Sequence, residues 1–434
     1  MAEIKPLRAW RYNKNLQKKI EILVSPLFDV ISEKQRDYLY GEKLNSIHLS
    51  APNGSDDSLS ASRKVIEWKK DGIILQDELP SIYVYYQYFA LPGSDKERVR
   101  KGFVANLKIY DWDDNVLLRH ENTMPFSVKD RMEVLAKTQM NVSPTHGLYT
   151  DTTYEIERYL DQAMIYPLYE TEDYQGARDV LGVIQDAKVI QRMMEIIKEK
   201  QIILADGHHR YEGSLLYKKE REKNNPHHQG TEGYNYHLMY FTNTEADDLR
   251  ILPTHRVICG AEHLSEEHLL KKLEKYFSIK TIDEVSDVNE IILGKKWAFG
   301  LLISKNAYKV RLKPGMIETM EWRFPQAIKE LDLTVLHYFI IEKCLGIHGK
   351  LQRGSRNIHF ERDFAKCLHQ VSNGEAQCAI ITQELSMNTV KEVCYSGSTL
   401  PQKSTYFYPK VICGFLFGSI KENEFKSFFD AAFQ

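Results

Sequence analysis

The densest group of chemically capable side chains is Asp206-Gly207-His208-His209-Arg210. It follows a short apolar run and precedes apolar residues at helical spacing, which places it between a buried strand and a helix. Gly207 permits a sharp turn, and the free N–H groups of a helix start favour an anion. His208, His209 and Arg210 add donors for phosphate oxygens, while Asp206 could hold a metal ion or orient a hydroxyl. The alternative is that Asp206 only caps the helix and that its polar neighbours have no role. Because α/β folds place ligands at such a turn, the position favours a ligand-binding role.

Acid–base chemistry could come from His120-Glu121-Asn122-Thr123, which follows a strand-and-turn region. Glu121 could take the proton of an acceptor hydroxyl, and a positioned base typically contributes about 10²–10⁴-fold to a rate. His120 or Thr123 could contact a phosphate. The alternative is a surface glutamate in a loop. Asp206 is a rival base, and the sequence alone does not divide these roles.

Three further groups could neutralise phosphate charge, which phosphoryl transfer needs more than covalent help. Arg131 follows Asp130 at an expected helix start and could equally pair with a neighbouring carboxylate. Thr254-His255-Arg256 supplies a hydroxyl and donors after a strand-like run. The third group is Lys403-Ser404-Thr405 with Lys410, which together bracket an aromatic run. Its two lysines and two hydroxyls suit a second phosphate. We interpret that run as packing.

Common nucleotide-binding and zinc-protease motifs are absent from the sequence. Gly349-Lys350 is followed by Leu351 and lacks the earlier glycine of a Gly-x-x-x-x-Gly-Lys-[Ser/Thr] loop. No Gly-x-Gly-x-x-Gly loop, His-Arg-Asp sequence or His-Glu-x-x-His pattern occurs. A donor without a base, such as pyrophosphate, would need no adenine pocket. ATP sites without these motifs exist, so the donor stays open.

Composition sets limits on the partners of the chain. The 434 residues include 58 Lys+Arg and 60 Asp+Glu, for a formal charge of -2, which disfavours nucleic acid and anionic membranes as partners. With 43% hydrophobic and 27% charged residues, the chain resembles a globular protein of two or three domains. The N-terminus has no apolar signal core, and no stretch is apolar enough to span a membrane. Six scattered cysteines indicate free thiols and a cytoplasmic location.

The elements that must position these groups alternate along the chain. Residues 82–86, 103–109, 297–303 and 379–382 read as strands, and 202–205 reads as a short buried strand. Helical spacing appears in residues 189–197, ending near Lys200, and in 269–277. The alternation predicts an α/β protein of the mixed α+β kind with undetermined strand order.

Several motifs in order resemble the family catalogued as domain of unknown function 1015. The segment Ala-Asp-Gly-His-His-Arg-Tyr-Glu carries the resemblance, which six further segments extend over nearly the whole chain: residues 8–12, 25–32, 120–123, 130–131, 252–256 and 401–410. One departure is Leu27-Phe28, where the family usually reads Pro-Tyr, so the role of that loop is less secure.

The resemblance implies a fold and an activity. The Asp-Gly-His-His-Arg turn resembles that of the ParB/sulfiredoxin superfamily, and of free serine kinases within it, which implies a kinase that uses pyrophosphate. It implies an N-terminal mixed region over 1–115, a ParB/sulfiredoxin-like core over 116–258, and a C-terminal α/β domain over 259–434 that completes the phosphate site. The expected ligands are L-serine, pyrophosphate (or ATP or ADP) and Mg²⁺.

The implied roles fall on residues already singled out. Catalytic roles go to Glu121, Asp206 and His208, with Asp206 also the metal ligand, and Asp29 and His208 contact the substrate. The phosphate-binding set is His120, Thr123, Arg131, His209, Arg210, His255, Arg256, Lys403, Ser404, Thr405 and Lys410. The competing functions are a ParB-like nuclease or nucleotide-dependent DNA-binding protein, a metal-dependent hydrolase, and a noncatalytic binding protein. The charge balance counts against the nucleic-acid alternative. The oligomeric state is not indicated.

Overall fold

The chain folds into two compact units. The computed structural model describes residues 1–53, 57–91, 94–173, 175–261, 264–352, 354–401 and 403–425. Unit 1 comprises Met1–Arg250 and Pro409–Gln434, and unit 2 comprises Ile251–Tyr408. This division differs from the three consecutive segments expected from the sequence. Strands from residues 1–115 and 116–250 share one sheet, and the chain returns to unit 1 at Pro409.

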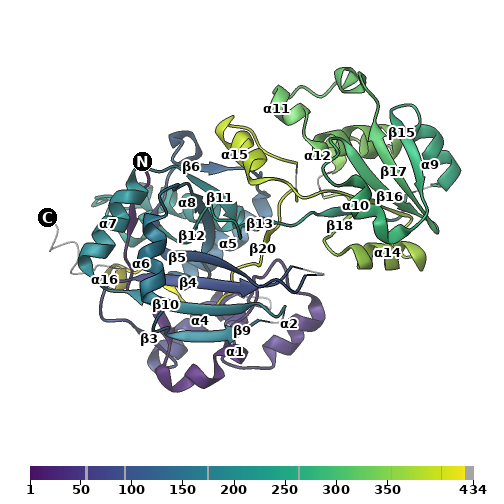
Figure 1. Cartoon of the computed structure of the whole chain (residues 1–434). Coiled ribbons are helices and arrows are strands. Elements are labelled where there is room, and N and C mark those ends of the chain that lie inside the picture. Colours follow the sequence, from purple (N-terminus) through teal and green to yellow (C-terminus); the bar gives the residue numbers. More distant parts are fainter. Residues whose placement is uncertain are drawn as a thin grey trace. The chain divides into compact units, whose positions relative to one another are not determined.

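A large mixed sheet forms the centre of unit 1 (Figure 1). Its described strands are β1 (Ile4–Lys5), β4 (Ile82–Phe89), β5 (Arg98–Lys108), β6 (Leu117–Arg119), β8 (Thr145–Tyr149), β9 (Tyr169–Glu172), β10 (Arg178–Ile184), β11 (Ile202–Asp206) and β12 (Tyr236–Asn243). Their order is β6-β11-β8-β12-β5-β4-β10-β9, with β1 beside β5. Two short pairs join β2 (Trp10–Tyr12) to β3 (Ile74–Gln76) and β7 (Met140–Asn141) to β21 (Gly418–Ser419).

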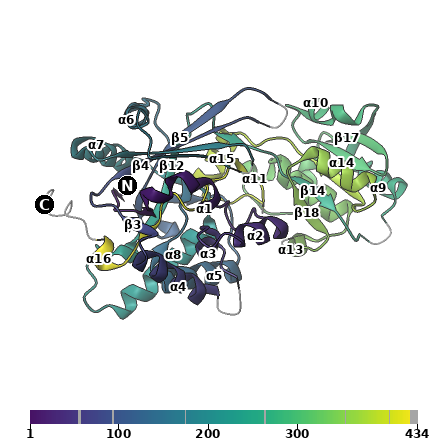
Figure 2. The same ribbon diagram turned by 90° about the horizontal axis from the view of Figure 1, so that it is seen from below.

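Helices cover both faces of this sheet. They are α1 (Ile20–Leu23), α2 (Glu33–Tyr40), α3 (Ile47–Ser50), α4 (Asp57–Lys70), α5 (Pro125–Thr138), α6 (Glu155–Ala163), α7 (Ala187–Lys198), α8 (His208–Asn224) and α16 (Glu422–Phe425). Figure 2 shows α6 and α7 on one side, with α1, α3 and α4 on the other. Alternate residues of β4 pack into two apolar clusters: Tyr83 and Tyr85 face α4, whereas Val84 and Tyr86 face α6 and α7. The tyrosine-rich run is therefore core.

Residues 409–420, which we name the C-terminal strap, are buried in unit 1. Val411, Ile412 and Phe417 belong to the apolar cluster on the α4 face. Cys413 exchanges backbone hydrogen bonds with Ser25, at 3.0 Å and 2.7 Å. The last part of the chain is thereby fixed beside the segment that begins at Ser25.

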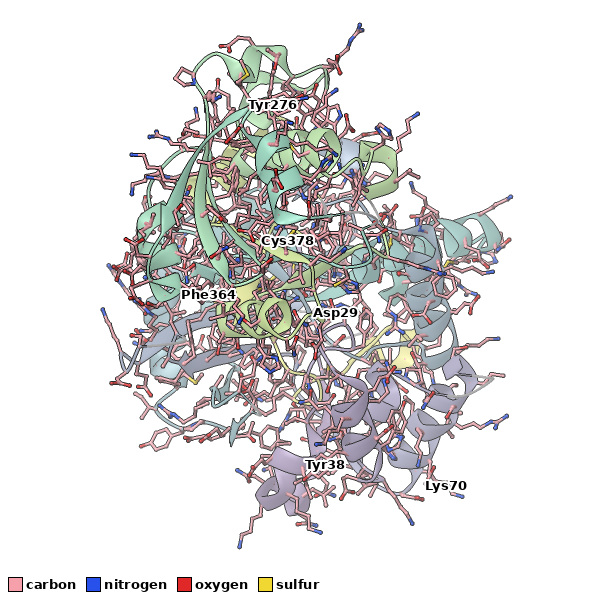
Figure 3. All side chains as sticks on the ribbon, turned by 90° about the vertical axis from the view of Figure 1, so that its right-hand side faces the viewer. Asp29, Tyr38, Lys70, Tyr276, Phe364 and Cys378 are labelled. Carbon is pink, nitrogen blue, oxygen red and sulfur yellow. The ribbon has the colours of Figure 1, made fainter. Side chains whose placement is uncertain are left out.

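Unit 2 contains a second sheet with helices on both faces. Its strands are β14 (His255–Ile258), β15 (Phe277–Ile282), β16 (Ala298–Ile303), β17 (Asn306–Leu312), β18 (Ile358–Glu361) and β19 (Cys378–Ile381), in the order β15-β17-β16-β19-β14-β18. β13 (Arg250–Ile251) and β20 (Phe407–Tyr408) lie at the ends of the unit. The helices are α9 (Glu266–Leu273), α10 (Val288–Ile292), α11 (Gln326–Lys329), α12 (Asp332–Val335), a π-helix (Leu336–Cys344), α13 (Gly349–Gln352), α14 (Phe364–Ser372) and α15 (Met387–Tyr395). Figure 3 labels Phe364 and Cys378, the first residues of α14 and β19.

The sequence predictions of elements are largely confirmed. The mixed α/β class is correct, and each predicted strand falls on an observed one. The helical spacing over 269–277 was misleading at its end, because α9 stops at Leu273 and Phe277 begins β15. Residues 277–282 pair one by one with β17 in an antiparallel ladder, so this end of the apolar pattern belongs to a strand. Among the described residues, no helix is long and apolar enough to cross a membrane.

Gly102 of β5 provides a test of the packing between β5 and β12. A Cβ atom there would lie 2.4 Å from the Phe241 carbonyl oxygen and 2.4 Å from the Tyr240 ring. We expect Gly102→Ala to lower the free energy of unfolding by about 1–3 kcal/mol in denaturant titrations. Gly41→Ala is the control, because that Cβ would meet only the Tyr38 carbonyl, at 3.1 Å. Equal stability of the two variants would contradict this packing.

Candidate functional site

Asp206 lies between two cations at the end of β11, with its side chain 12% exposed. Its Oδ2 accepts from Arg210 Nη2 at 2.8 Å, and its Oδ1 accepts from Lys410 Nζ. Gly207 makes the turn into α8 with φ 91°, and a Cβ there would lie 2.5 Å from Thr145 and 2.9 Å from Arg210 Nη2. The turn therefore requires glycine. The three charges come from β11, α8 and the C-terminal strap.

The two cations control the ionisation of Asp206. Burial alone would raise its pKa, but the positive charges of Lys410 and Arg210 outweigh burial and hold the pKa well below its ordinary value. The carboxylate stays ionised at neutral pH and has little affinity for a proton. An efficient general base has a pKa near the working pH. Asp206 is therefore suited to orienting cations, which favours Glu121 as the base.

Two buried histidines stand at the same edge of the sheet. β6 runs parallel to β11, with Arg119 opposite Leu204, so His120 and the Asp206 turn follow neighbouring strand ends. The rings of His120 and His208 meet edge to face, with centroids 4.7 Å apart. Burial lowers the pKa of His120 to about 4 and that of His208 well below its ordinary value. Both rings are neutral at pH 7, and His208 Nε2 has no hydrogen-bond partner among the described residues.

The loop between β6 and α5 supplies the predicted Glu121, which is half-buried there. The main-chain N–H of Met124 donates to His209 Nε2 at 3.0 Å, so that nitrogen cannot also donate to a phosphate. The Thr123 hydroxyl donates to Glu212 Oε2 at 2.6 Å. These bonds fix the loop against the first turn of α8. The phosphate-binding roles of His209 and Thr123 stay predictions.

Arg131 forms an ion pair with a neighbouring carboxylate, which was the alternative to a phosphate-binding role. Its guanidinium pairs with Asp130 at 2.5 Å and donates to the Ser50 carbonyl at 2.7 Å. It also lies 4.3 Å from the centroid of the Phe28 ring. Arg131 thus ties α5 to the loop near residue 28, where the sequence departs from the family pattern.

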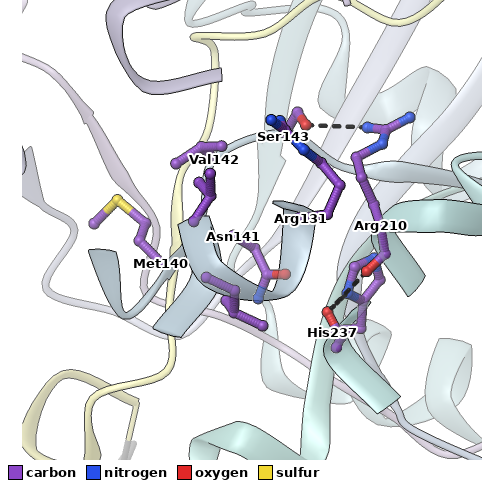
Figure 4. Close-up of a pocket in the computed structure, with 10 residues that line it drawn as sticks. Arg131, Met140, Asn141, Val142, Ser143, Arg210 and His237 are labelled. Carbon is purple, nitrogen blue, oxygen red and sulfur yellow. Dashed lines mark hydrogen bonds between the residues drawn. The ribbon is translucent and has the colours of Figure 1, made fainter. Parts of the chain in front are cut away.

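A small cavity lies under Arg210 (Figure 4). Arg210 donates from Nη1 to Ser143 Oγ at 3.0 Å and to the Pro144 carbonyl at 2.7 Å, and Arg131 and His237 also line the space. The cavity measures about 30 Å³, room for a water molecule but not for an amino acid. Arg210 is thus a buried framework residue as well as a partner of Asp206.

A buried polar row holds the strap in place. Arg100 of β5 donates to the Pro409 carbonyl, and Gln87 of β4 donates to the Lys410 carbonyl at 3.0 Å. Gln87 also donates to Asp179 Oδ1 on β10 at 2.8 Å and accepts from Arg100. Asp179, Gln87 and Arg100 occupy directly paired positions on neighbouring strands. We name these three residues the clamp, because they fix the backbone that carries Lys410.

A larger cavity adjoins the segment that contains Asp29. It measures about 570 Å³, within the range of small-molecule sites, and is lined in part by Ser25, Pro26 and Ile412. Asp29 itself is exposed (labelled in Figure 3) and does not line this cavity. Its contact with a substrate stays a prediction.

The remaining predicted residues belong to unit 2. His255 and Arg256 are buried on β14, and the His255 ring accepts from the Thr382 N–H at 3.2 Å. Ser404 is buried and its hydroxyl donates to the Pro401 carbonyl, while Lys403 and Thr405 are half-buried. Gln402, within the family segment 401–410, lies outside the described residues. A joint phosphate site of these residues with the Asp206 turn stays a prediction.

The predicted magnesium role of Asp206 meets an obstacle. Both carboxylate oxygens are engaged by cations, and no group of three or more metal-ligating side chains exists among the described residues. In the arrangement seen here Asp206 does not fit a resident cation. The magnesium requirement stays a prediction.

Sequence reasoning missed the clamp and His146. His146 lies opposite Asp206 on β8, is buried, and bonds Thr242 Oγ1 through Nε2 at 2.7 Å. A single amide in the run Tyr-Tyr-Gln87-Tyr-Phe was the one signal for the clamp, since apolar strands seldom bury an amide without a partner. Arg100 gave no signal, because Arg98 and Lys101 beside it make this stretch of the sequence look like the solvent-exposed end of a strand.

Comparison with known proteins establishes the family. A family model described as "Protein of unknown function (DUF1015)" matches residues 4–334, well over half of the chain. The chain belongs to this family. The match confirms the resemblance carried by the Asp-Gly-His-His-Arg turn. No curated protein matches the sequence.

Three solved structures illustrate the distant structural likeness of this DUF1015 member. A conserved hypothetical protein from Pyrococcus furiosus is 10% identical with a TM-score of 0.36, over 72% of this chain and 94% of that chain. A free serine kinase in complex with AMP is 11% identical with a TM-score of 0.36, over 72% and 90%. SbnI with C-terminal truncation from Staphylococcus aureus is 11% identical with a TM-score of 0.36, over 73% and 87%.

The clamp predicts an unusual pH dependence of stability. Burial raises the pKa of Asp179 to about 8, so the folded state holds a proton that the unfolded chain releases near pH 4. Between these values the folded state binds more protons, and stability falls as pH rises. An asparagine does not titrate, so the Tm of Asp179→Asn relative to the wild type should increase from pH 5 to pH 8.

The control for this measurement is Asp113→Asn, at an exposed position. Its Tm difference from the wild type should stay constant over the same pH range. A constant difference for Asp179→Asn would show that Asp179 is ionised in the folded protein at pH 5, contrary to this account.

Proposed function

We propose that this chain is a phosphotransferase that moves a phosphoryl group from pyrophosphate, or from ATP or ADP, to the hydroxyl of free L-serine. The serine oxygen forms a bond to phosphorus, the bond to the leaving group (phosphate, ADP or AMP, according to the donor) breaks, and Glu121 takes the hydroxyl proton. The product is O-phosphoserine. The observation that carries the proposal is the cluster of Asp206, Lys410 and Arg210 at a helix start beside two neutral histidines.

The charges of this cluster suit a phosphate group. Two cations face one carboxylate, which leaves one positive charge, and the N-terminus of the 17-residue helix α8 adds a partial positive charge. His208 Nε2 provides a further buried polar atom without a partner among the described residues. Electrostatic positioning of this kind supplies most of the catalysis in phosphoryl transfer.

The cavity of about 570 Å³ supports an amino-acid substrate. Its lining includes the carboxylates of Glu21, Glu42, Glu172 and Asp173, which would attract an ammonium group and repel phosphate. Ile412 of the strap lines this cavity. Lys410, two residues before Ile412 and therefore about 7 Å away along an extended chain, contacts Asp206. In this proposal the serine ammonium lies toward the cavity and the hydroxyl toward Glu121.

The activity is tested by incubating the whole chain with L-serine and magnesium, together with pyrophosphate, ATP or ADP. O-phosphoserine is detected by ³¹P NMR. We expect product with at least one donor, and loss of product when EDTA removes magnesium. Absence of product with all three donors would refute the proposed function.

Two substitutions test the roles of the acids. Glu121→Gln should lower kcat by about 10²-fold or more, because the amide cannot accept the proton. Asp206→Asn should lower kcat by a similar factor, because the neutral amide would no longer hold Lys410 and Arg210 in place. Asp113→Asn, an exposed substitution with no role at the site, is the control. Near-normal rates in both site variants would refute the assignment.

Lys403 tests the second-phosphate role of unit 2. Lys403→Ala should raise the KM for the phosphate donor and leave the KM for serine unchanged, because it would contact only the donor. Steady-state kinetics with each substrate varied in turn measures this. An unchanged donor KM would remove Lys403 from the site.

A further inference from the structure

A second concentration of buried polar groups lies inside unit 2, around Arg256. This residue is 0% exposed at the centre of β14, paired across the sheet with Phe360 of β18 and Ile380 of β19. Its guanidinium lies 5.3 Å from the centroid of the Phe360 ring. A buried guanidinium in such apolar surroundings requires compensation.

The guanidinium has one occupied edge and one open edge. Nη1 donates to the Thr254 carbonyl, whereas Nε and Nη2 have no hydrogen-bond partner among the residues that the structure describes. These two nitrogens carry the parallel N–H bonds that bind two oxygens of one oxyanion. Burial lowers the pKa of Arg256 to about 9, so it remains charged at neutral pH. Among the described residues no carboxylate forms an ion pair with it.

Two further buried polar atoms, on α12 and on the π-helix that follows it, have no hydrogen-bond partner among the described residues. His337 is 6% exposed, and its burial, together with the positive charge of Arg256, lowers its pKa to about 3. His337 Nδ1 bonds Gln352 Oε1 at 2.8 Å, while Gln352 Nε2 donates to two carbonyls. Nδ1 therefore carries the proton, and Nε2 is a buried acceptor that no donor contacts in the described part of the chain. Thr334 is 0% exposed and stands three residues earlier on the same helical face, and no described residue bonds its hydroxyl.

We propose that unit 2 binds a hydrogen phosphate ion, free or as the terminal group of a larger molecule, at Arg256, His337 and Thr334. Two phosphate oxygens accept from the Nε and Nη2 edge of Arg256, and the protonated oxygen donates to His337 Nε2. Thr334 donates to the remaining oxygen. A carboxylate would fill the arginine edge but has no proton to offer His337, so phosphate fits better. All three residues belong to unit 2, and phosphate binding to them can be measured whether or not the chain is a kinase, although Arg256 is also one of the residues predicted to bind the donor phosphate.

Calorimetric titration of the whole chain with inorganic phosphate tests the affinity, with acetate as the carboxylate comparison. Arg256→Gln should weaken phosphate binding at one site by about 10-fold or more, since a charged bidentate contact is lost. Arg311→Gln, an exposed arginine on β17, is the control and should bind as the wild type does. Unchanged phosphate binding in Arg256→Gln, or acetate binding as tight as phosphate, would overturn the proposal.

Crystals of the wild-type chain soaked with arsenate locate the site without a substitution. Arsenate shares the shape and protonation of phosphate, and its arsenic gives an anomalous signal. We expect an anomalous peak within contact distance of Arg256 Nε and Nη2. Water alone at that edge, with arsenic bound only elsewhere, would overturn the proposal even if Arg256→Gln fails to fold. A serine kinase assay that fails would leave this result untouched.

Discussion

The ion pairs of Asp206 hold the candidate site together. One carboxylate joins Arg210 in the first turn of α8 to Lys410 in the strap, two residues that are 200 positions apart in the sequence. The side chains are almost fully shielded from water, so their attraction is screened little by salt. Removing one partner of a buried ion pair typically costs about 3–5 kcal/mol, because the other charge stays buried without compensation. The turn, the helix start and the strap therefore depend on one another.

The clamp extends this dependence across the sheet. Arg100 and Gln87 bind two consecutive carbonyls of the strap, and Asp179 binds Gln87 from the next strand. A carboxyl that remains protonated near neutral pH adds no charge to this buried row. The positive charge of Lys410 thus meets the negative charge of Asp206 without a competing carboxylate from the clamp. The strap follows unit 2 in the chain, so the site in unit 1 is complete only once the chain has passed through unit 2.

The sequence predicted the local features of the site better than its assembly. The strand at 202–205, the turn at Gly207 and the helix after it follow from apolar spacing and a glycine, which are local properties. His120 and Asp206 each carried a local signal, and parallel pairing of β6 with β11 explains why they meet. Lys410 was expected at a phosphate but not as the partner of Asp206, since no short-range pattern encodes a contact over 204 residues. The same holds for the domain boundaries, because no local pattern indicates that the chain returns to unit 1 at Pro409.

The central claim is that Asp206 and Lys410 act as one unit in the site. The most direct test is a double-mutant cycle with Asp206→Asn, Lys410→Met and the double variant. Its two readouts are kcat for O-phosphoserine formation and the free energy of unfolding. The account predicts that the double variant loses little more than either single variant, with a coupling of about 1–3 kcal/mol in stability. Additive losses in both readouts would show that the two residues act independently and would contradict the account.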